Sequence, residues 1–532
     1  METFKKTHRH VVLVLVLFVC FIISSHLPCE NGDPALFASA SPFDEAVAEG
    51  KLIEFDQVVA FGSWKAAIEA FDAMAGGDRL IVKDTHYEGT GNAKGHLVEA
   101  GKDLQTGKLT IEVWPLSGNP GGHVELLRVC LYALAPGDEL LFHEGLYQRL
   151  VSIYAENIGF HAGGKADKPI RIRGYGNGEK RPLFRNTAAR NNLWEMMQSN
   201  VEISYMEFSA PIHRSLRLMG ASKGKTDKHG TTLSMGKVQN IGDTPINRIM
   251  ENLTVRDCIF RDTNGGVTIG SNDSGVEYNN LVIDGNTFEN ISYTVFYFGQ
   301  HDGLSPHDGL VLRNNFVDCT DIPGKNNDIV GYCIETKRGV VGYVMENNLI
   351  ISPYGPGIMF YGGQPGYPWP GTTNSVIRNN VIVGGRGDGI NISGGPVTVE
   401  NNIVMNNRTN IHLHSYGKYE HDNVYRGIAV RNNFTGFGRS GNVQVATAVQ
   451  QSVSAGDVVV SGNTQLTESG TGLKAIATDM VQIRAIPKGF HALMAAISER
   501  YQSNKSVYTD TEVENLFVSK LEISVAVKEN NK

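Results

Sequence analysis

The chain has 532 residues, of which 60 are glycine and 19% are charged, and its formal net charge at pH 7 is −7. This length exceeds what one compact core usually holds, and the composition favours folded β structure over disorder. The acidic balance argues against a nucleic-acid-binding protein, which usually carries a basic excess, but local basic groups still allow an acidic polysaccharide as partner.

The first 40 residues are typical of an export signal. Lys5, Lys6 and Arg9 precede an unbroken run of 13 apolar residues, Val11–Ile23, and Ala38–Ala40 offers a cleavage site. Such a run suits a signal peptide, because a membrane span needs roughly 20 residues. We therefore expect a secreted or periplasmic protein with no membrane attachment after cleavage. An uncleaved anchor is the alternative.

Four of the six cysteines lie beyond this segment, at Cys130, Cys258, Cys319 and Cys333. Their spacings match neither a CxxC pair nor a zinc motif, which argues against a metal–thiolate site. We expect them to be small buried residues, and a disulfide formed after export stays open.

Two stretches of the N-terminal third echo each other. Trp64–Glu88 and Val124–Gln148 both read as an amphipathic helix, then Gly-Asp, then a strand, then Tyr. A helix in such a place can cover the open end of a stack of strands, where apolar core and strand edges would otherwise meet water. We therefore predict an N-terminal cap with α and β elements over residues 41–136.

Residues 137–470 repeat a short β-type run, followed by a polar pair that usually ends in asparagine and, in most copies, by another apolar run. Aligning the copies places seven asparagines in one column, with spacings of 29, 33, 32, 22, 31 and 30 residues. Periods of this size predict a solenoid. The members of this asparagine column are Asn286, Asn315, Asn348, Asn380, Asn402, Asn433 and Asn463.

Asparagine suits this column for two reasons. It tolerates the left-handed backbone that a sharp turn between strands needs, and its amide can hydrogen-bond to the amides of the coils above and below. Met206 and Cys258 occupy the same column without an amide. We therefore expect the ladder to begin near Asn286, with apolar stacking before it.

The repeat stops after Asn463. Pro487–Arg500 then has Phe490, Leu493, Met494 and Ile497 at helical spacing. We predict a helical C-terminal cap and tail over residues 471–532, closing the end of the solenoid.

The asparagine ladder, the glycine-bounded strands and the segment GYCIETKRG (Gly331–Gly339) resemble the pectate-lyase-like superfamily, and within it the alginate and chondroitin lyases and the mannuronan C5-epimerases. The resemblance covers roughly Gly137 to Asn463. It implies an all-β chain, a single-stranded right-handed parallel β-helix that acts on a polysaccharide, and we expect it to be a monomer.

Alternate residues of a strand point to opposite sides. With the inward residues of the later strands stacked, the outward residues form two neighbouring columns suited to sugar binding. The first outward column holds Thr268, Tyr297, Glu335, Met359, Asn391 and His412, and the second holds Gly270, Gly299, Lys337, Tyr361, Ser393 and His414. Tyr367 and Trp369 lie on a proline-rich loop that could form a groove wall. We expect substrate contacts from Tyr297, Asn391, His414, Tyr367 and Trp369.

Glu335, Lys337 and Arg338 form the sharpest local group. Proton abstraction beside a uronate carboxylate needs a group that neutralises the carboxylate and a base that takes the proton. The resemblance implies that Arg338 and Lys337 take these roles, with Ca²⁺ as a candidate cofactor held by Glu335 and Asp328. A plain Glu–Lys pair on a solvated strand is the alternative.

Histidines provide further candidates. Ser305-Pro306-His307-Asp308 is similar to the Asp-Pro-His-Asp segment of mannuronan epimerases, which implies that His307 is a base, whereas a plain turn is the alternative. His412 and His414, two residues apart, could act as base and acid or bind a metal. Tyr361 completes the predicted catalytic set.

The leading functional hypothesis is a lyase or C5-epimerase of a uronate-containing polysaccharide. One alternative is a glycoside hydrolase, which needs facing carboxylates. Another is a carbohydrate-binding or surface protein without catalysis. The carboxylates available for hydrolysis are Asp302, Asp308, Asp328, Glu335 and Asp388.

Overall fold

The computed structural model describes the chain in separate stretches. These are residues 52–54, 71, 73–83, 96–115, 130–131, 133–148, 153–154, 164–176, 180–185, 194–196, 199–209, 214–218, 249–269, 277–298, 307–319, 332–336, 340–362, 375–414, 425–466, 471–503 and 508–521. The chain divides into two units, Met1–Lys51 and Leu52–Lys532, and every described residue belongs to the second. The predicted export signal, residues 1–40, therefore lies outside the described residues. Within the described stretches, no helix combines the length and apolarity that crossing a membrane requires.

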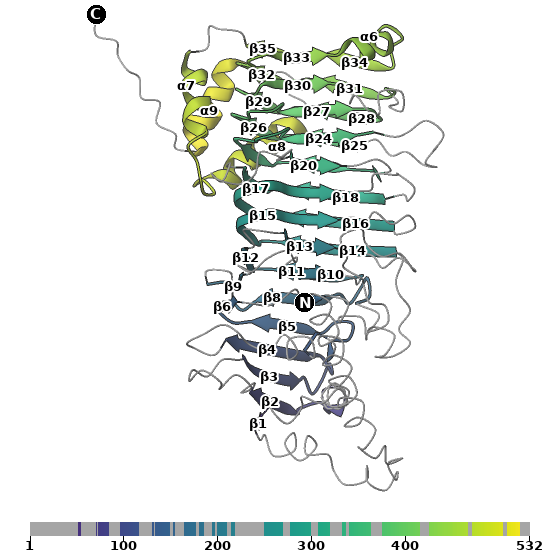
Figure 1. The fold of residues 1–532 in the computed structure, drawn as a ribbon, viewed down its shortest axis with the longest axis vertical. Helices are drawn as coiled ribbons and strands as arrows, with labels where there is room; N and C mark the ends of the chain where they lie inside the picture. The colour runs from purple at the N-terminus through teal and green to yellow at the C-terminus, as the bar shows by residue number, and fades with distance from the viewer. Residues whose placement is uncertain are drawn as a thin grey trace, which may run out of the picture. The chain divides into compact units, whose positions relative to one another are not determined.

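Two sheets run along the stack of coils in the second unit (Figure 1). The first sheet contains β1 (Leu52–Glu54), β2 (Arg79–Lys83), β3 (His96–Lys102), β4 (Leu109–Pro115), β5 (Glu139–Phe142), β8 (Ile170–Gly174), β11 (Val201–Ser204), β14 (Ile249–Arg256), β16 (Glu277–Asp284), β18 (His307–Arg313), β22 (Val344–Glu346), β25 (Ser375–Arg378), β28 (Val397–Glu400), β31 (Ile428–Arg431) and β34 (Val458–Ser461), with β21 (Val340–Val341) beside β18.

The second sheet carries the remaining described strands. These are β6 (Gly145–Gln148), β7 (Ile153–Tyr154), β9 (Pro182–Arg185), β10 (Trp194–Met196), β12 (Glu207–Ser209), β13 (Arg214–Leu218), β15 (Ile259–Ile269), β17 (Thr287–Phe298), β19 (Phe316–Asp318), β20 (Tyr332–Thr336), β23 (Leu349–Ile351), β24 (Ile358–Tyr361), β26 (Val381–Val383), β27 (Ile390–Ser393), β29 (Ile403–Met405), β30 (Thr409–Leu413), β32 (Phe434–Gly436), β33 (Gly441–Val445) and β35 (Thr464–Leu466).

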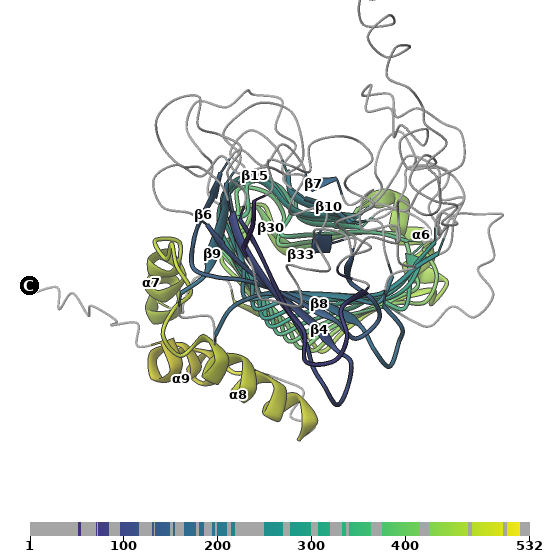
Figure 2. The same ribbon diagram turned by 90° about the horizontal axis from the view of Figure 1, so that it is seen from below.

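A typical coil contributes one strand to the first sheet and two segments to the second. In one coil these are β25, β26 and β27, whereas β15 and β17 each run through both second-sheet positions as one long strand. Seen along the stack, the coils form three sides (Figure 2), and the apolar side chains that point inward are buried. Neighbouring coils pair in parallel, so the chain is the predicted parallel β-helix.

The first sheet includes strands that precede the predicted boundary at residue 137 in the sequence. β4 pairs in parallel with β5, and β3 joins β2 and β4 in antiparallel pairs. The predicted N-terminal cap region over residues 41–136 therefore contributes strands that continue the sheet of the solenoid.

The two copies of the N-terminal echo have the same local turn. Asp78 accepts a hydrogen bond from the Ala75 backbone N–H at 2.6 Å, and Asp138 accepts the equivalent bond from Ala135 at 2.7 Å. The glycine before each aspartate has a positive φ, 95° at Gly77 and 99° at Gly137. Both copies then enter a strand of the first sheet, which explains why Gly-Asp recurs.

The two residues of each polar pair have different roles in the turn between the sheets. The first residue adopts the left-handed backbone, with φ of 56° at Asn314, 58° at Asn347 and 56° at Asn432, and glycine takes this place at Gly285 and Gly462. The prediction that the asparagine column itself adopts this conformation is wrong, because its members are the second residues of the pairs. None of them has a positive φ, and all are buried except Asn463 in the last coil, which is partly buried.

The buried amides of the asparagine column bond from coil to coil. Asn348 Nδ2 donates to Asn380 Oδ1 at 2.9 Å, and that oxygen also accepts the Asn348 backbone N–H at 3.1 Å. Asn315, Asn402 and Asn433 donate to the next column member at the same 2.9 Å. The backbone N–H of Cys258 donates to Asn286 Oδ1 at 3.0 Å, so the amide ladder starts where the sequence predicted.

A second column, on the outer side of the first sheet, alternates in charge. Strand pairing aligns Arg256, Asp284, Arg313, Glu346, Arg378, Glu400 and Arg431, which we call the charge column. Arg313 lies 2.8 Å from Asp284, Arg378 lies 2.7 Å from Glu346 and Arg431 lies 2.9 Å from Glu400. Each partly solvated pair is worth roughly 0–1 kcal/mol, and a slipped register would separate the opposite charges.

Three C-terminal helices lie along a flank of the solenoid, so the prediction that they close its end needs correction. α7 (Thr471–Met480), α8 (Phe490–Gln502) and α9 (Asp510–Leu521) pack on the outer side of the second sheet (Figures 1 and 2). The outward residues there are apolar and need cover, and they form one buried cluster with the helices. Its strand members are Phe316, Leu349, Ile351, Val381, Val383, Ile403, Met405 and Phe434, and its helix members include Leu473, Ile476, Phe490, Leu493, Ile497, Val513 and Phe517.

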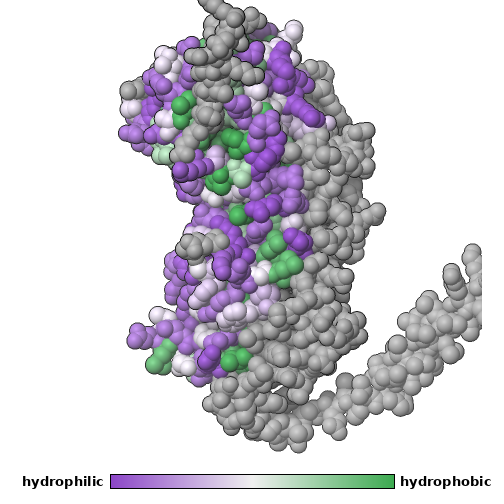
Figure 3. Space-filling view, turned by 90° about the vertical axis from the view of Figure 1, so that its left-hand side faces the viewer, coloured by the Kyte–Doolittle hydropathy of each residue, from purple (hydrophilic) through white to green (hydrophobic). Residues whose placement is uncertain are grey.

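The surface on the helix side of the molecule is mostly hydrophilic, with a few small hydrophobic patches (Figure 3). A fourth helix, α6 (Thr447–Ser454), lies between β33 and β34 in the last coils. Helices α7, α8 and α9 therefore bury the apolar strand residues of this flank and present polar residues to the solvent in their place.

Two of the cysteines form a disulfide. Cys319, just after β19, is bonded to Cys333 in β20, and the bond closes a loop of 14 residues. Cys130 and Cys258 are buried free thiols, as predicted, and burial raises the pKa of the Cys258 thiol to about 12.

Asn380→Ala tests the asparagine column. The change removes a donor and an acceptor from a fully buried site, so the Asn348 backbone N–H loses its acceptor, and the Asn348 amide, the Asn402 amide oxygen and the Met345 carbonyl each lose one hydrogen bond. A buried donor left unpaired costs about 1–3 kcal/mol and each further lost hydrogen bond about 0.5–1.5 kcal/mol, so we expect a loss of about 3 kcal/mol in urea unfolding.

Asn432→Gly is the matched control. Asn432 precedes the column residue Asn433 and has a positive φ of 56°, which glycine adopts without strain. A change below about 1 kcal/mol is expected there. Equal losses in the two variants would contradict the role given to the column.

Candidate functional site

Strand pairing in the second sheet aligns residues of the first outward column. Tyr297 pairs with Glu335, Glu335 with Met359, Met359 with Asn391, and Asn391 with His412. The same register continues to Arg217 and Thr268 on one side and to Gln444 on the other. Five predicted positions from consecutive coils therefore lie next to one another.

Part of the second outward column lies beside the first. Tyr361 pairs with Ser393, and the Ser393 hydroxyl donates to the backbone oxygen of His414 at 2.9 Å. The rings of His412 and His414 are 4.8 Å apart. The structure thus brings together Tyr361, Asn391, His412 and His414 of the predicted site.

The outward columns are far less solvated than an ordinary outer strand surface. Glu335 is 3% exposed, and Met359, Tyr361 and Asn391 are also buried. Tyr332, Met359 and Tyr361 pack together as a separate apolar cluster. A carboxyl, an amide and aromatic rings are therefore held in a dry environment, where electrostatic interactions are stronger than in water.

Asp388 organises the polar part of this site. Its side chain is fully buried, and its Oδ2 accepts hydrogen bonds from His412 Nδ1 and Asn391 Nδ2, both at 3.0 Å. Its other oxygen, Oδ1, accepts from Arg408 Nε at 3.0 Å. One carboxylate thereby holds an imidazole on one oxygen and a guanidinium on the other.

Glycines on either side let Asp388 reach this position. A Cβ atom at Gly387 would lie 2.3 Å from the Gly355 backbone, and one at Gly389 would lie 2.4 Å from Val404. The turn therefore packs against the neighbouring coils only with glycine at both places. Asp388 lies two residues before β27, and its carboxylate contacts Asn391 and His412 of the first outward column.

Asp388 is ionised in the folded protein. Burial opposes its charge, but hydrogen bonds from His412 and Arg408 hold its pKa well below the usual range. An ionised carboxylate only accepts hydrogen bonds, so in the neutral form of the His412 ring the proton lies on Nδ1, which donates a hydrogen bond to Asp388. Nε2 of the same ring is then left as a proton acceptor.

His412 and Arg408 have access to solvent on the outer side. The His412 side chain is 17% exposed and the Arg408 side chain is 55% exposed, whereas the carboxylate between them is 0% exposed. Only Nε of Arg408 bonds to Asp388. The terminal guanidinium nitrogens therefore remain able to meet an anionic ligand.

Several predicted residues cannot be placed. Lys337, Arg338, Asp328, Tyr367 and Trp369 lie outside the described residues, and their roles stay predictions. The backbone of His307 starts strand β18 of the first sheet, where it pairs with Tyr278 and Val340. His307 thus begins a strand on a different sheet from the outward columns.

Sequence reasoning missed Asp388 and Arg408 as members of the site. Asp388 entered only as one of five carboxylates available for hydrolysis, and Arg408 was not considered. The signal was present as Gly387-Asp388-Gly389, an acidic residue between two glycines directly before a strand whose outward residue is Asn391.

Calcium binding stays a prediction. Among the described residues, no group of three or more His, Cys, Asp or Glu could hold a metal ion. Glu335 is buried in the first outward column, and its predicted co-ligand Asp328 lies outside the described stretches. We therefore derive no chemical step through a metal.

Comparison with known proteins agrees with this fold. Residues 251–435 match the family model described as "Right handed beta helix region". Together with the strand topology, this match confirms the predicted right-handed parallel β-helix fold. No curated protein is detectably similar in sequence.

Similar solved structures have low identity. A variant of the PL6 family alginate lyase AlyGC is 16% identical with a TM-score of 0.34, over 60% of this chain and 39% of that chain. An alginate lyase from Paenibacillus sp. str. FPU-7 is 13% identical with a TM-score of 0.35, over 65% and 96%. A rhamnogalacturonan lyase is 13% identical with a TM-score of 0.38, over 67% and 87%. The chain thus spans about two fifths of the length of the AlyGC variant.

Asp388→Asn tests the electrostatics of the site. The variant leaves Arg408 without a counter-charge, and we expect it to lose about 3 kcal/mol at neutral pH in urea unfolding. The native pKa of Asp388 lies below its unfolded value of about 3.9, so its contribution is present above that pH and declines as the pH falls. The difference between wild type and variant should therefore shrink below about pH 4.

Asp479→Asn, an exposed carboxyl of α7, is the control and should change stability by less than about 0.5 kcal/mol. A stability difference for Asp388→Asn that stays constant down to about pH 2 would contradict the ionised, hydrogen-bonded Asp388.

Proposed function

We propose that this protein is an exported enzyme that removes the C5 proton of a uronate residue in an acidic polysaccharide, leading to β-elimination or C5 epimerisation. The observation that carries the proposal is the buried Asp388, which holds a base, His412, and a cation, Arg408, on its two oxygens at 3.0 Å. The chemistry requires these two functions side by side, since the proton becomes acidic only when the neighbouring carboxylate is neutralised.

The assigned roles follow from the hydrogen bonds. Asp388 keeps the proton of neutral His412 on Nδ1, so that Nε2 takes the C5 proton, and it stabilises the imidazolium that results. The free guanidinium nitrogens of Arg408 bind the uronate carboxylate. Asn391 Nδ2 donates a hydrogen bond to the same Asp388 oxygen that His412 contacts, and this bond helps to hold the carboxylate in place.

A second proton carrier is needed in either reaction. Elimination requires an acid at the leaving glycosidic oxygen, and epimerisation requires an acid on the opposite face of the sugar. Two residues of the second outward column are candidates for this role. One is His414, whose ring lies 4.8 Å from that of His412, and the other is Tyr361.

Hydrolysis receives less support from the same geometry. A glycosidase needs one carboxyl that holds a proton at working pH and another that acts as base or nucleophile. Asp388 accepts three hydrogen bonds and its pKa is held low, so it cannot supply the proton. A purely binding protein would have no need of a buried His–Asp pair.

The disulfide supports action outside the cytoplasm. Cys319–Cys333 is a bond that persists in oxidising compartments and is rare where thiols are kept reduced. Together with the N-terminal segment that is typical of an export signal, it favours the secreted or periplasmic location.

The reaction can be assigned with a panel of uronate polymers. Elimination raises the ultraviolet absorbance of unsaturated uronide, and epimerisation in deuterated water incorporates deuterium at C5 without chain cleavage. We expect one of these two results. New reducing ends without absorbance would indicate hydrolysis, and binding without turnover or exchange would indicate a carbohydrate-binding protein; either result would overturn the proposal.

His412→Gln tests the assignment of the base. Glutamine keeps a polar side chain of similar reach but cannot take the proton, so we expect turnover to fall by at least about 100-fold. His491→Gln, on the exposed side of α8, is the matched control and should keep full activity. Undiminished turnover in His412→Gln would remove His412 from the mechanism.

A further inference from the structure

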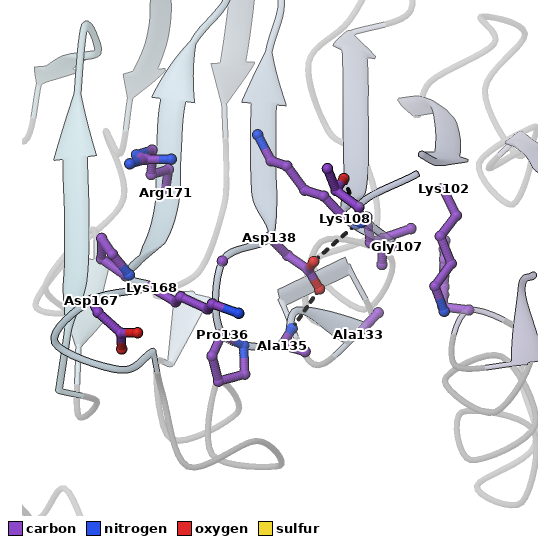
Figure 4. Close-up of a pocket in the computed structure, with 15 residues that line it drawn as sticks. Lys102, Gly107, Lys108, Ala133, Ala135, Pro136, Asp138, Asp167, Lys168 and Arg171 are labelled. Atoms are coloured by element: carbon purple, nitrogen blue, oxygen red, sulfur yellow. Dashed lines mark hydrogen bonds between the residues drawn. The ribbon is translucent and has the colours of Figure 1, made fainter. Parts of the chain in front are cut away.

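A pocket of about 440 Å³ lies at the start of strands β4, β5 and β8, far from Asp388 and His412. It is lined by the turn between β3 and β4, the Gly-Asp turn before β5 and the turn before β8 (Figure 4). Six coils separate β8 from β25, the first-sheet strand of the coil that contains Asp388. At about 4.8 Å per coil, the two places are roughly 29 Å apart.

Basic side chains outnumber acidic ones in this pocket. Lys102, Lys108, Lys168 and Arg171 line it, against the two carboxylates Asp138 and Asp167. These cations come from two segments, the β3–β4 turn and the start of β8, and Figure 4 shows Lys168 reaching toward Asp138, with Lys102 on the opposite side. A local positive excess is unusual in a chain whose net charge is −7.

Internal partners account for only part of this charge. Lys108 Nζ binds Glu139 at 2.6 Å. The carboxylate of Asp138 accepts the backbone N–H groups of Leu109 at 2.9 Å and Ala135 at 2.7 Å, which joins the two turns.

The other three cations, Lys102, Lys168 and Arg171, form no ion pair with any described residue. Three like charges around one cavity repel one another, and an anion in the cavity would relieve that repulsion.

We infer that this pocket binds an acidic sugar residue, whose carboxylate or sulfate meets Lys168 and Arg171, while Lys102 adds positive charge from the opposite side of the cavity. Arginine can bind such an oxyanion with two parallel hydrogen bonds, and the lysines add charge. Ala133, Ala135, Pro136 and Pro169 supply apolar surface for the ring. The volume suits a small ligand. The positive charges of the pocket predict an anionic ligand, whereas the inference that this anionic group belongs to a sugar rests on the proposed function.

The pocket would then hold a substrate polymer at a second point, remote from the reacting residue. A ligand anchored at two sites gains affinity through the high effective concentration at the second site. Because binding in the pocket needs no turnover, it can be tested whether or not the protein acts on uronates.

The test is calorimetric titration with glucuronate, inorganic sulfate and glucose. The double variant Lys168→Ala/Arg171→Ala should bind glucuronate at least ten-fold more weakly, and raised NaCl should weaken wild-type binding. Both side chains are exposed, so an unchanged melting temperature should show that the variant is folded. The control Lys180→Ala/Lys474→Ala removes the same charge from exposed positions outside the pocket and should bind like the wild type.

His412→Gln should retain pocket binding, which separates this site from the catalytic one. The inference is overturned if the pocket variant binds glucuronate as tightly as the control, or if glucose binds as tightly as glucuronate. Sulfate binding that is lost in the pocket variant, without glucuronate binding, would overturn the assignment to an acidic sugar.

Discussion

Hydrogen bonding between buried amides of successive coils is the constraint on which the rest of the structure depends. Each member of the asparagine column donates to the next at 2.9–3.2 Å and is satisfied only in one register. A slip by one residue would exchange the inward and outward faces of every strand and leave buried amides unpaired. The alignment of Glu335, Asn391 and His412 in one outward column follows from that register.

The two sheets use charge in different ways. On the first sheet, the charge column pairs Arg with Asp or Glu from coil to coil in partial contact with water, where each pair contributes little. On the second sheet, Asp388 is fully buried and holds three donors. Removing such a carboxylate from water is expensive unless every oxygen is paired, and the three donors to Asp388 meet this requirement.

Much of the coil architecture could be predicted from the asparagine pairs. Each pair fixes one turn and one hydrogen-bond position, so the strands between successive pairs have little freedom in their register. The same pairs identified Asn391 and His412 as neighbours 21 residues apart. The left-handed residue was misplaced by one position because asparagine occupies both places of most pairs. The flank position of α8 could not be predicted, since an amphipathic pattern shows that a face is buried but not what covers it.

Asp388 escaped prediction for a related reason. It lies outside the repeated strand and turn pattern, and its partners His412 and Arg408 belong to the next coil, so its role depends on tertiary contacts. The alternation of the charge column was readable as Arg, Asp, Arg, Glu, Arg, Glu and Arg before successive polar pairs. Lys337 and Arg338, which lie outside the described residues, remain candidates from the sequence in addition to the Asp388 group.

The alternation of the charge column also limits how such a protein can grow or shrink. Between Arg256 and Arg431 each coil carries the opposite sign from its neighbours. Loss of a single coil would bring two arginines or two carboxylates into direct contact, whereas loss of two adjacent coils would restore the pattern. The natural unit of duplication in this part of the chain is therefore a pair of coils, about sixty residues, although the backbone repeats with every turn.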